Sequence, residues 1–159
     1  MTLQEFSDTY GIETNLFESY LTLLSIKPFL NEKCFIGGGF ILDCLQGTIP
    51  KDVDVFFTDE EAHLNFQNNY SKKYKIFKVD TVYRKNSQVL GYQTIEQRLS
   101  HADFTITQFV YDGTFLYFGE NTVNDMKEKC LTINRYPLSK NFVTRLNRYF
   151  KKGYSKVTI

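Results

Sequence analysis

Two aspartates one residue apart, Asp52 and Asp54, are the residues of this 159-residue sequence best suited to chemistry. They open the segment DVDVFF, in which charged residues alternate with β-branched and aromatic ones, so a strand is predicted from about Val53. Strand side chains alternate with period two, which puts both carboxylates on one face. Mg²⁺ binds one or two carboxylates together with water and phosphate oxygens, so the pair suits this ion. A solvated acidic pair at a strand edge is the commoner alternative.

The glycines that precede this pair strengthen the metal hypothesis. A short apolar strand at 34–36 runs into Gly37, Gly38 and Gly39, and a short helix and a loop follow. Without a Cβ, Gly38 and Gly39 leave backbone N–H groups and a helix N-terminus open to a triphosphate. Two ions held by carboxylates can bind the attacking and leaving oxygens of an in-line displacement. The alternative explanation of these glycines is that they allow a helix and a strand to cross closely.

The remaining sequence predicts alternating helices and strands. Apolar spacing and breaker residues place the expected elements as follows: helices at 15–30 (ended or bent by Pro28), 60–70, 94–99, 123–129 and 138–152; an antiparallel pair at 76–83 and 89–94; a hairpin of 103–111 and 114–118 around Asp112 and Gly113; and an extended piece at 131–133.

These elements predict an α/β (α+β) fold with two layers. We expect a small mixed, mainly antiparallel sheet with helices on one side and a nucleotide between the sheet and the glycines. A chain of this length suits one hydrophobic core, so residues 1–159 are expected to form a single domain. Its parts would be an N-terminal helical segment (1–33), a catalytic core (34–118) and a basic C-terminal helical segment (119–159).

Composition indicates a cytoplasmic protein. The three cysteines are odd in number and lack CxxC spacing, which favours a reducing compartment over a disulfide framework or a zinc site. Residues 1–26 contain no Lys or Arg, unlike the start of a secretory signal. No apolar run approaches the roughly 20 residues that cross a bilayer, so no membrane partner is expected.

Positive charge is concentrated near the C-terminus, although the formal net charge is only +1. Residues 126–159 hold nine Lys or Arg residues and one Glu. This asymmetry predicts a face that receives a triphosphate or an RNA end. A solvated, lysine-rich helix surface would show the same pattern.

Two segments carry a family resemblance. GGGFILDCLQGTIPKDVDVFF resembles the head domain of the polymerase β-like nucleotidyltransferases, in the group of the CCA-adding enzymes and bacterial poly(A) polymerases. That group reads roughly Gly-Gly-x-x-Arg-Asp, a short helix, Gly, and Lys-Asp-hydrophobic-Asp. Downstream, HADFTITQFVYDG is similar to the group's Arg-Arg-Asp-Phe-Thr-Ile motif. The resemblance covers about residues 34–118 and implies a minimal version of the head domain.

The resemblance implies roles for individual residues. They are phosphate contacts for Gly38 and Gly39, Mg²⁺ or Mn²⁺ ligation by Asp52 and Asp54, a third carboxylate at Asp80, a ribose contact for Asp103, and nucleotide contacts for Lys51, Arg145 and Arg148. Asp80 would otherwise be a surface residue of a half-buried strand, and Asp103 would simply begin a strand.

The sequence also departs from the group's pattern. Leu42, His101 and Ala102 stand where the group has arginines. The residues that would replace their charge are Lys51, Arg84, Arg98, Arg145 and Arg148. His101 would suit a general base, but a lone histidine beside a strand is more often a polar surface residue.

The expected reaction is transfer of a nucleoside monophosphate from a nucleoside triphosphate to an acceptor hydroxyl, with release of pyrophosphate. An RNA 3′ end such as that of tRNA is the favoured acceptor. The group's neck, body and tail domains are not expected here, so a complete CCA-adding cycle is not predicted. Two alternatives stay open: a catalytically weakened binding or inhibitory module, and a stand-alone transferase that modifies a protein or small molecule. The composition would suit a phage or mobile-element gene.

Overall fold

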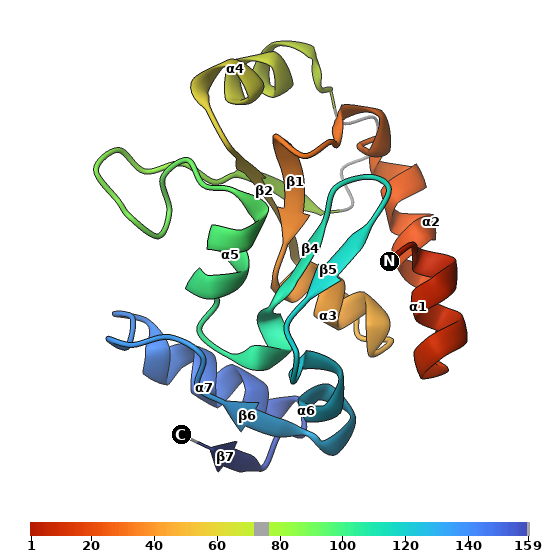
Figure 1. Ribbon diagram of the computed structural model, residues 1–159, viewed down its shortest axis with the longest axis vertical. Helices are drawn as coiled ribbons and strands as arrows, with labels where there is room; N and C mark the ends of the chain where they lie inside the picture. The colour runs from red at the N-terminus through yellow and green to blue at the C-terminus, as the bar shows by residue number, and fades with distance from the viewer. Residues whose placement is uncertain (72–76, 159) are drawn as a thin grey trace.

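A five-stranded sheet forms the centre of the molecule, in the order β3-β2-β1-β4-β5 (Figure 1). The computed structural model describes residues 1–71 and 77–158. Its elements are α1 (Leu3–Tyr10), α2 (Asn15–Leu24), η1 (Lys27–Phe29), β1 (Cys34–Gly37), α3 (Gly39–Leu45), β2 (Asp52–Phe57), α4 (Glu60–Asn69), β3 (Lys78–Thr81), α5 (Ile95–His101), η2 (Thr105–Thr107), β4 (Phe109–Tyr111), β5 (Leu116–Phe118), α6 (Thr122–Glu128), β6 (Cys130–Thr132), α7 (Phe142–Lys151) and β7 (Lys156–Thr158).

The sheet is mixed and mainly antiparallel, which confirms the predicted fold class. The central strand β1 pairs antiparallel with β2 on one side and with β4 on the other. β4 and β5 form the predicted hairpin. β3 extends the sheet beyond β2 in the parallel direction. The short strands β6 and β7 form a separate parallel pair.

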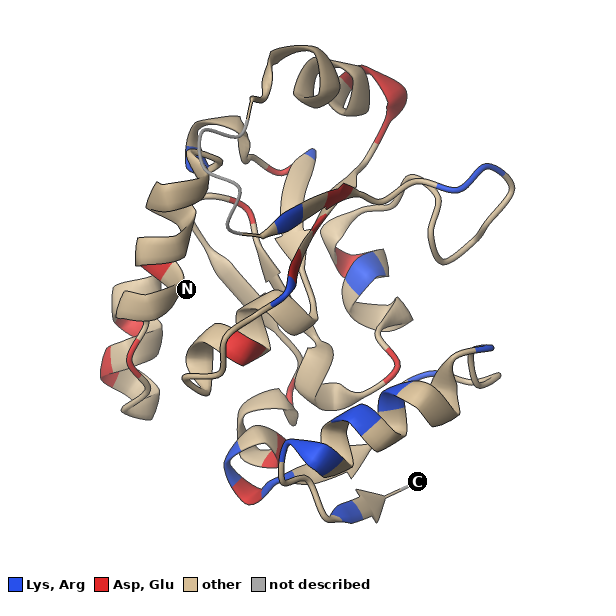
Figure 2. Cartoon of the chain, turned by 180° about the vertical axis from the view of Figure 1, so that it is seen from behind, with Lys and Arg blue, Asp and Glu red and all other residues tan. Residues whose placement is uncertain are grey.

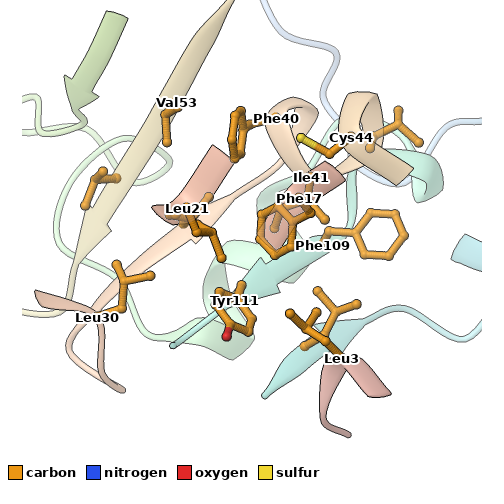
Figure 3. Close-up of a cluster of buried hydrophobic side chains, with 14 of the residues drawn as sticks. Leu3, Phe17, Leu21, Leu30, Phe40, Ile41, Cys44, Val53, Phe109 and Tyr111 are labelled. Atoms are coloured by element: carbon orange, nitrogen blue, oxygen red, sulfur yellow. The ribbon is translucent and has the colours of Figure 1, made fainter. Parts of the chain in front are cut away.

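The two faces of the sheet bury different side chains. One face, with Val53 and Val55, packs on α1, α2 and α3 in the main core. In this core, drawn in Figure 3, the rings of Phe17 and Tyr111 meet edge to face with centroids 5.2 Å apart. On the opposite face α5 covers a smaller cluster that includes Phe35 and Phe56. The helices therefore lie on both sides of the sheet, and the prediction of helices on one side was wrong.

Local capping interactions fix several helix starts. The side chain of Asp59 accepts a hydrogen bond from the Ala62 amide at the start of α4. Thr94 and Gln97 form a capping box at the start of α5, where each side chain bonds the other residue's backbone N–H. Such caps satisfy N–H groups that the first turn of a helix leaves without partners. Among the described residues, no helix is long and apolar enough to cross a membrane.

The predicted antiparallel pair of 76–83 and 89–94 was wrong. β3 instead pairs parallel with β2, because the outer edge of β2 is available to it. Residues 89–94 form turns and no strand. The buried Gln93 amide stabilises these turns by donating hydrogen bonds to the carbonyls of Val89 (2.8 Å) and Gly91 (3.3 Å). Residue 76, the predicted start of the first strand, lies outside the described residues.

Three further predicted elements are shorter than expected. The strand at 103–111 is interrupted by η2, where the Thr107 hydroxyl donates to the Phe104 carbonyl and competes with strand pairing. The last helix starts at Phe142 rather than at 138, because Ser139 bonds Asp103 with its side chain. The first predicted helix ends at Leu24, where Ser25 adopts a left-handed conformation before Pro28 is reached. The N-terminal segment was expected to be helical, but no separate helix at α1 and no strand at β7 was predicted.

Candidate active site

β2 places Asp52 and Asp54 on the face of the sheet that α5 covers. The alternate residues Val53, Val55 and Phe57 point into the main core and are fully buried. Asp52 is exposed at the strand start, and Asp54 is half-buried one step further in. The two carboxylates therefore lie along one strand face, graded from solvent toward the interior.

The neighbouring strands bring a glycine and a third carboxylate to Asp54. In the antiparallel register of β1 and β2, Asp54 pairs with Gly37, and in the parallel register of β2 and β3 it pairs with Asp80. Adjacent strands lie about 4.8 Å apart, so both partners are immediate neighbours of Asp54. Asp80 also forms an ion pair with Lys78 at 3.3 Å. Asp52, Asp54 and Asp80 are called the acidic strand cluster below.

The electrostatics of Asp54 reflect this crowding. Burial, followed by the negative charges of Asp80 and Asp52, raises its pKa from 3.8 to about 6, and the positive charges of Arg98 and Arg145 oppose this shift. Among the described residues, Asp54 makes no side-chain hydrogen bond or ion pair. It is a half-buried carboxylate that lacks a bonded counter-charge.

The glycine turn starts directly after the residue paired with Asp54. Gly38 has φ +73° and ψ −134°, a backbone conformation that side chains with a Cβ rarely adopt, and its N–H donates to the Phe109 carbonyl at 2.9 Å. A Cβ on Gly37 would approach the Phe56 ring to 3.0 Å, whereas one on Gly38 would meet nothing within 4 Å. The turn is thus packed on its Gly37 side and open at Gly38.

Arg98 lies on α5 above the same sheet face. Its guanidinium carbon lies 4.7 Å from the centroid of the Phe56 ring. Burial lowers the pKa of Arg98 to about 10, while the charges of Asp54 and Asp103 act in the opposite direction. The side chain therefore stays positively charged at neutral pH. It supplies a cation to the acidic strand cluster.

Asp103 anchors the C-terminal segment. Its buried carboxylate accepts hydrogen bonds from Arg135 (2.8 Å), Ser139 (3.3 Å) and Arg145. Burial acts to raise its pKa, but the bonds and charges of Arg145 and Arg135 outweigh burial and lower it. The carboxylate that the family resemblance assigns to ribose is therefore bound to two arginines.

A second ion pair attaches the other end of α7. Lys152 donates to the carboxylate of the buried Asp43 at 2.7 Å. Between Arg145 and Lys152 on the helix, Arg148 is exposed and makes no hydrogen bond or ion pair within the described part of the chain. Figure 2 shows the basic positions that recur along α7. α7 thus carries one free guanidinium between two anchored cations.

The departures from the family pattern fall on buried or uncharged positions. Leu42 is fully buried in the main core, and Ala102 is also buried. His101 Nδ1 lies 3.2 Å from the Gln93 side-chain oxygen and holds the preceding loop to α5. Burial, and then the charges of Arg98 and Arg135, lower the His101 pKa. No cation takes the place of the arginines at these positions, and the cations come from α5 and the C-terminal segment.

Two residues near the site were not identified from the sequence, and two that were identified are exposed in the structure. Arg135 was not singled out; the bridge between Phe104 and Ile133 and the hydrogen bond from the Asn134 N–H to the Asp103 carbonyl bring it to Asp103. Tyr149 was not singled out either, although it is buried beside Gly39. Lys51 is exposed next to Asp52 in sequence, and Arg84 is exposed on the loop after β3.

Solved structures with similar folds include tRNA-processing enzymes. The complex of a CCA-adding enzyme with CTP has a TM-score of 0.61 and 16% identity, and the match covers 100% of this chain and 44% of that one. The Bacillus stearothermophilus CCA-adding enzyme in complex with CTP has a TM-score of 0.62 and 15% identity, with 89% and 40% covered. A tRNA nucleotidyltransferase complexed with a primer tRNA and an incoming ATP analog has a TM-score of 0.50 and 16% identity, with 76% and 47% covered.

These matches define the class of the fold. The chain has a nucleotidyltransferase-like fold, so the resemblance predicted from the sequence is confirmed at the level of the fold, and the chain spans less than half the length of these three structures. A sequence model of the family described as "Gabija anti-defense 2 family protein" matches residues 11–129. The chain belongs to the Gabija anti-defense 2 family. A search among curated proteins finds no match.

Proposed function

We propose that this chain transfers a nucleoside monophosphate from a nucleoside triphosphate to an acceptor hydroxyl and releases pyrophosphate, in a reaction that requires Mg²⁺ or Mn²⁺. The observation that carries the proposal is the strand register around Asp54, which pairs with Gly37 at the glycine turn and with Asp80 on β3. This register joins a carboxylate group to a backbone bend that is open at Gly38.

The acidic strand cluster has donors that fit a divalent cation. Burial, and then the like charges of the cluster, raise the pKa of Asp54, and a cation between Asp52 and Asp54 would relieve the repulsion between these charges. In the described ranges, no group of three or more His, Cys, Asp or Glu residues is arranged to hold a metal by itself. Mg²⁺ commonly takes one or two carboxylates and completes its shell with water and phosphate oxygens. When bound, the ion would make the acceptor hydroxyl more acidic and neutralise phosphate charge.

The chain's own cations would bind the phosphates. Arg98 faces the sheet surface that carries Asp54, and Arg148 is free of partners on α7 among the described residues. Arg145 acts on the pKa of Asp54 while it is bonded to Asp103. These guanidiniums would neutralise the triphosphate and the pyrophosphate that leaves, in place of the arginines absent at positions 42, 101 and 102. Lys51 would contribute at the exposed end of β2.

An RNA 3′ end, such as that of tRNA, is the proposed acceptor. Five exposed cations of the C-terminal segment have no carboxylate partner among the described residues: Lys127, Lys140, Arg148, Lys151 and Lys156. Such a surface binds a phosphate backbone without regard to sequence. A similar structure contains a primer tRNA, which supports the same choice.

Membership of the Gabija anti-defense 2 family favours a second candidate function, in which the chain acts on a protein. It would either bind and inhibit a component of a defence system or transfer a nucleotide to a hydroxyl of that protein. The engagement of Asp103 by two arginines supports weak turnover, since a ribose would compete with them for the carboxylate.

Transfer of label distinguishes these functions. The purified protein is incubated with Mg²⁺ and each α-labelled nucleoside triphosphate, with and without tRNA, and with a lysate of cells that carry the defence system. Label on tRNA supports the first proposal, and label on a protein supports the protein acceptor. Asp54→Ala should abolish either signal, whereas Asp8→Asn, which removes an exposed carboxylate on α1, should not. Equal labelling by wild type and Asp54→Ala would remove Asp54 from the mechanism.

A further inference from the structure

Tyr149 places a hydroxyl at the glycine turn. The side chain is 5% exposed, and its oxygen lies 3.8 Å from the position a Cβ on Gly39 would occupy. Among the described residues, this hydroxyl has no hydrogen-bond partner. The oxygen is not one of the fully buried polar atoms that lack a partner, so it is accessible from solvent. An unbonded hydroxyl beside the turn is therefore available to donate to a ligand bound there.

Packing holds the Tyr149 ring in place. The ring meets Phe104 edge to face at 5.6 Å and Tyr154 edge to face at 5.8 Å. The Lys152 ammonium lies 5.5 Å from its centroid and is itself bonded to Asp43. Since these neighbours fix the ring, the hydroxyl is directed to the turn before any ligand arrives.

The charges around the hydroxyl favour an anion. Burial, and then the charge of Asp43, raise the pKa of Tyr149 to about 12, while Arg148 and Arg145 oppose this. The group is therefore protonated at neutral pH and available as a donor. The two nearby carboxylates, Asp43 and Asp103, are each paired with cations, so Arg148 leaves an uncompensated positive charge beside the hydroxyl.

We propose that the Tyr149 hydroxyl donates a hydrogen bond to the phosphate chain of the nucleotide bound at the glycine turn. This assignment rests on the proposed function, since it takes the triphosphate as the ligand. It makes Tyr149 a nucleotide-binding residue contributed by α7, outside the range 11–129 that the family model matches.

Tyr149→Phe tests this contact because it removes only the hydroxyl. Titration calorimetry with Mg²⁺ and ATP should show the dissociation constant raised about tenfold, the effect of one hydrogen bond to a charged group. Adenosine, which has no phosphate, should bind both proteins equally. Tyr154→Phe is the matched control: it removes the hydroxyl of another buried tyrosine of the C-terminal segment, one that is bonded to Gln46, and should leave ATP affinity unchanged.

The possible outcomes separate the two proposals. If the wild type binds ATP and Tyr149→Phe binds it equally well, the Tyr149 contact is refuted and the proposed function stands. If the wild type binds no nucleoside triphosphate, both are refuted. A second measurement does not depend on the folding of the variant: the ¹⁹F resonance of 3-fluorotyrosine placed at position 149 should shift on addition of ATP but not of adenosine. An unmoved resonance at saturating ATP would refute the contact.

Discussion

Replacement of Asp54 by asparagine should make the protein more stable and inactive. The carboxylate is ionised at neutral pH although burial and two neighbouring acids raise its pKa from 3.8 to about 6. At 1.36 kcal/mol for each pKa unit, holding that charge costs about 3 kcal/mol of folding free energy at pH 7. The asparagine side chain carries no charge, and after some loss for its buried amide the variant should gain about 2 kcal/mol.

The raised pKa of Asp54 also determines how the stability of the protein changes with pH. Because the folded-state pKa lies above the unfolded value, the folded state binds more protons between about pH 4 and 6, and stability falls as pH rises through this window. The folding free energy that the ionised Asp54 costs should fall to about half its pH 7 value at pH 5 and vanish near pH 3. The advantage of Asp54→Asn over the wild type should therefore be largest at neutral pH.

Urea unfolding at pH 7 and pH 5, without divalent ions, measures both effects. Asp8→Asn, in which the lost carboxylate is exposed on α1, is the control and should follow the wild type at each pH. A difference between wild type and Asp54→Asn that stays the same at the two pH values would refute the argument from crowded charges. So would a variant less stable than the wild type at pH 7.

Three other results are expected. Mg²⁺ at ten times its dissociation constant should stabilise the wild type by about 1.4 kcal/mol and leave Asp54→Asn unchanged in thermal melts; equal stabilisation of both would place the ion elsewhere. Arg145→Ala should lower the free energy of unfolding by about 1 to 3 kcal/mol, because the buried Asp103 keeps only Arg135 and Ser139, and should raise the KM for the triphosphate; Thr144→Ala, at an exposed neighbouring position of α7, is the control. Gly38→Ala should cost about 1 to 3 kcal/mol in urea unfolding through backbone strain alone, since its Cβ meets no atom within 4 Å; an unchanged midpoint would show that the turn adopts another conformation.

Local sequence signals were sufficient for the part of the fold that carries the acidic strand cluster. Period-two alternation after Asp52 predicted β2, and the glycines predicted a bend between β1 and α3. These features depend on residues that are close together in the chain. Their interactions are short in range, so the sequence pattern records them directly.

Pairing between distant segments was not predictable in the same way. A short strand such as β3 fits either a hairpin or a parallel neighbour, and the choice is made by the free edge of β2. The same limit applies to the site. Asp103 is bonded to Arg135, 32 residues away, and to Arg145, 42 residues away, and no spacing rule relates such positions. The network around Asp103 was therefore visible only in three dimensions.

The ion pairs that connect α7 to the rest of the protein have a practical consequence for the design of truncated forms. A shortened form cut after residue 129, where the family match ends, would strip Asp103 of both arginines and Asp43 of its lysine. Interior carboxylates deprived of counter-ions are strongly destabilising, commonly by about 3 to 5 kcal/mol for each broken pair. Residues that the family match omits thus carry part of the protein's stability, and a fragment chosen by sequence similarity alone should fail to fold even though every strand of the central sheet is retained.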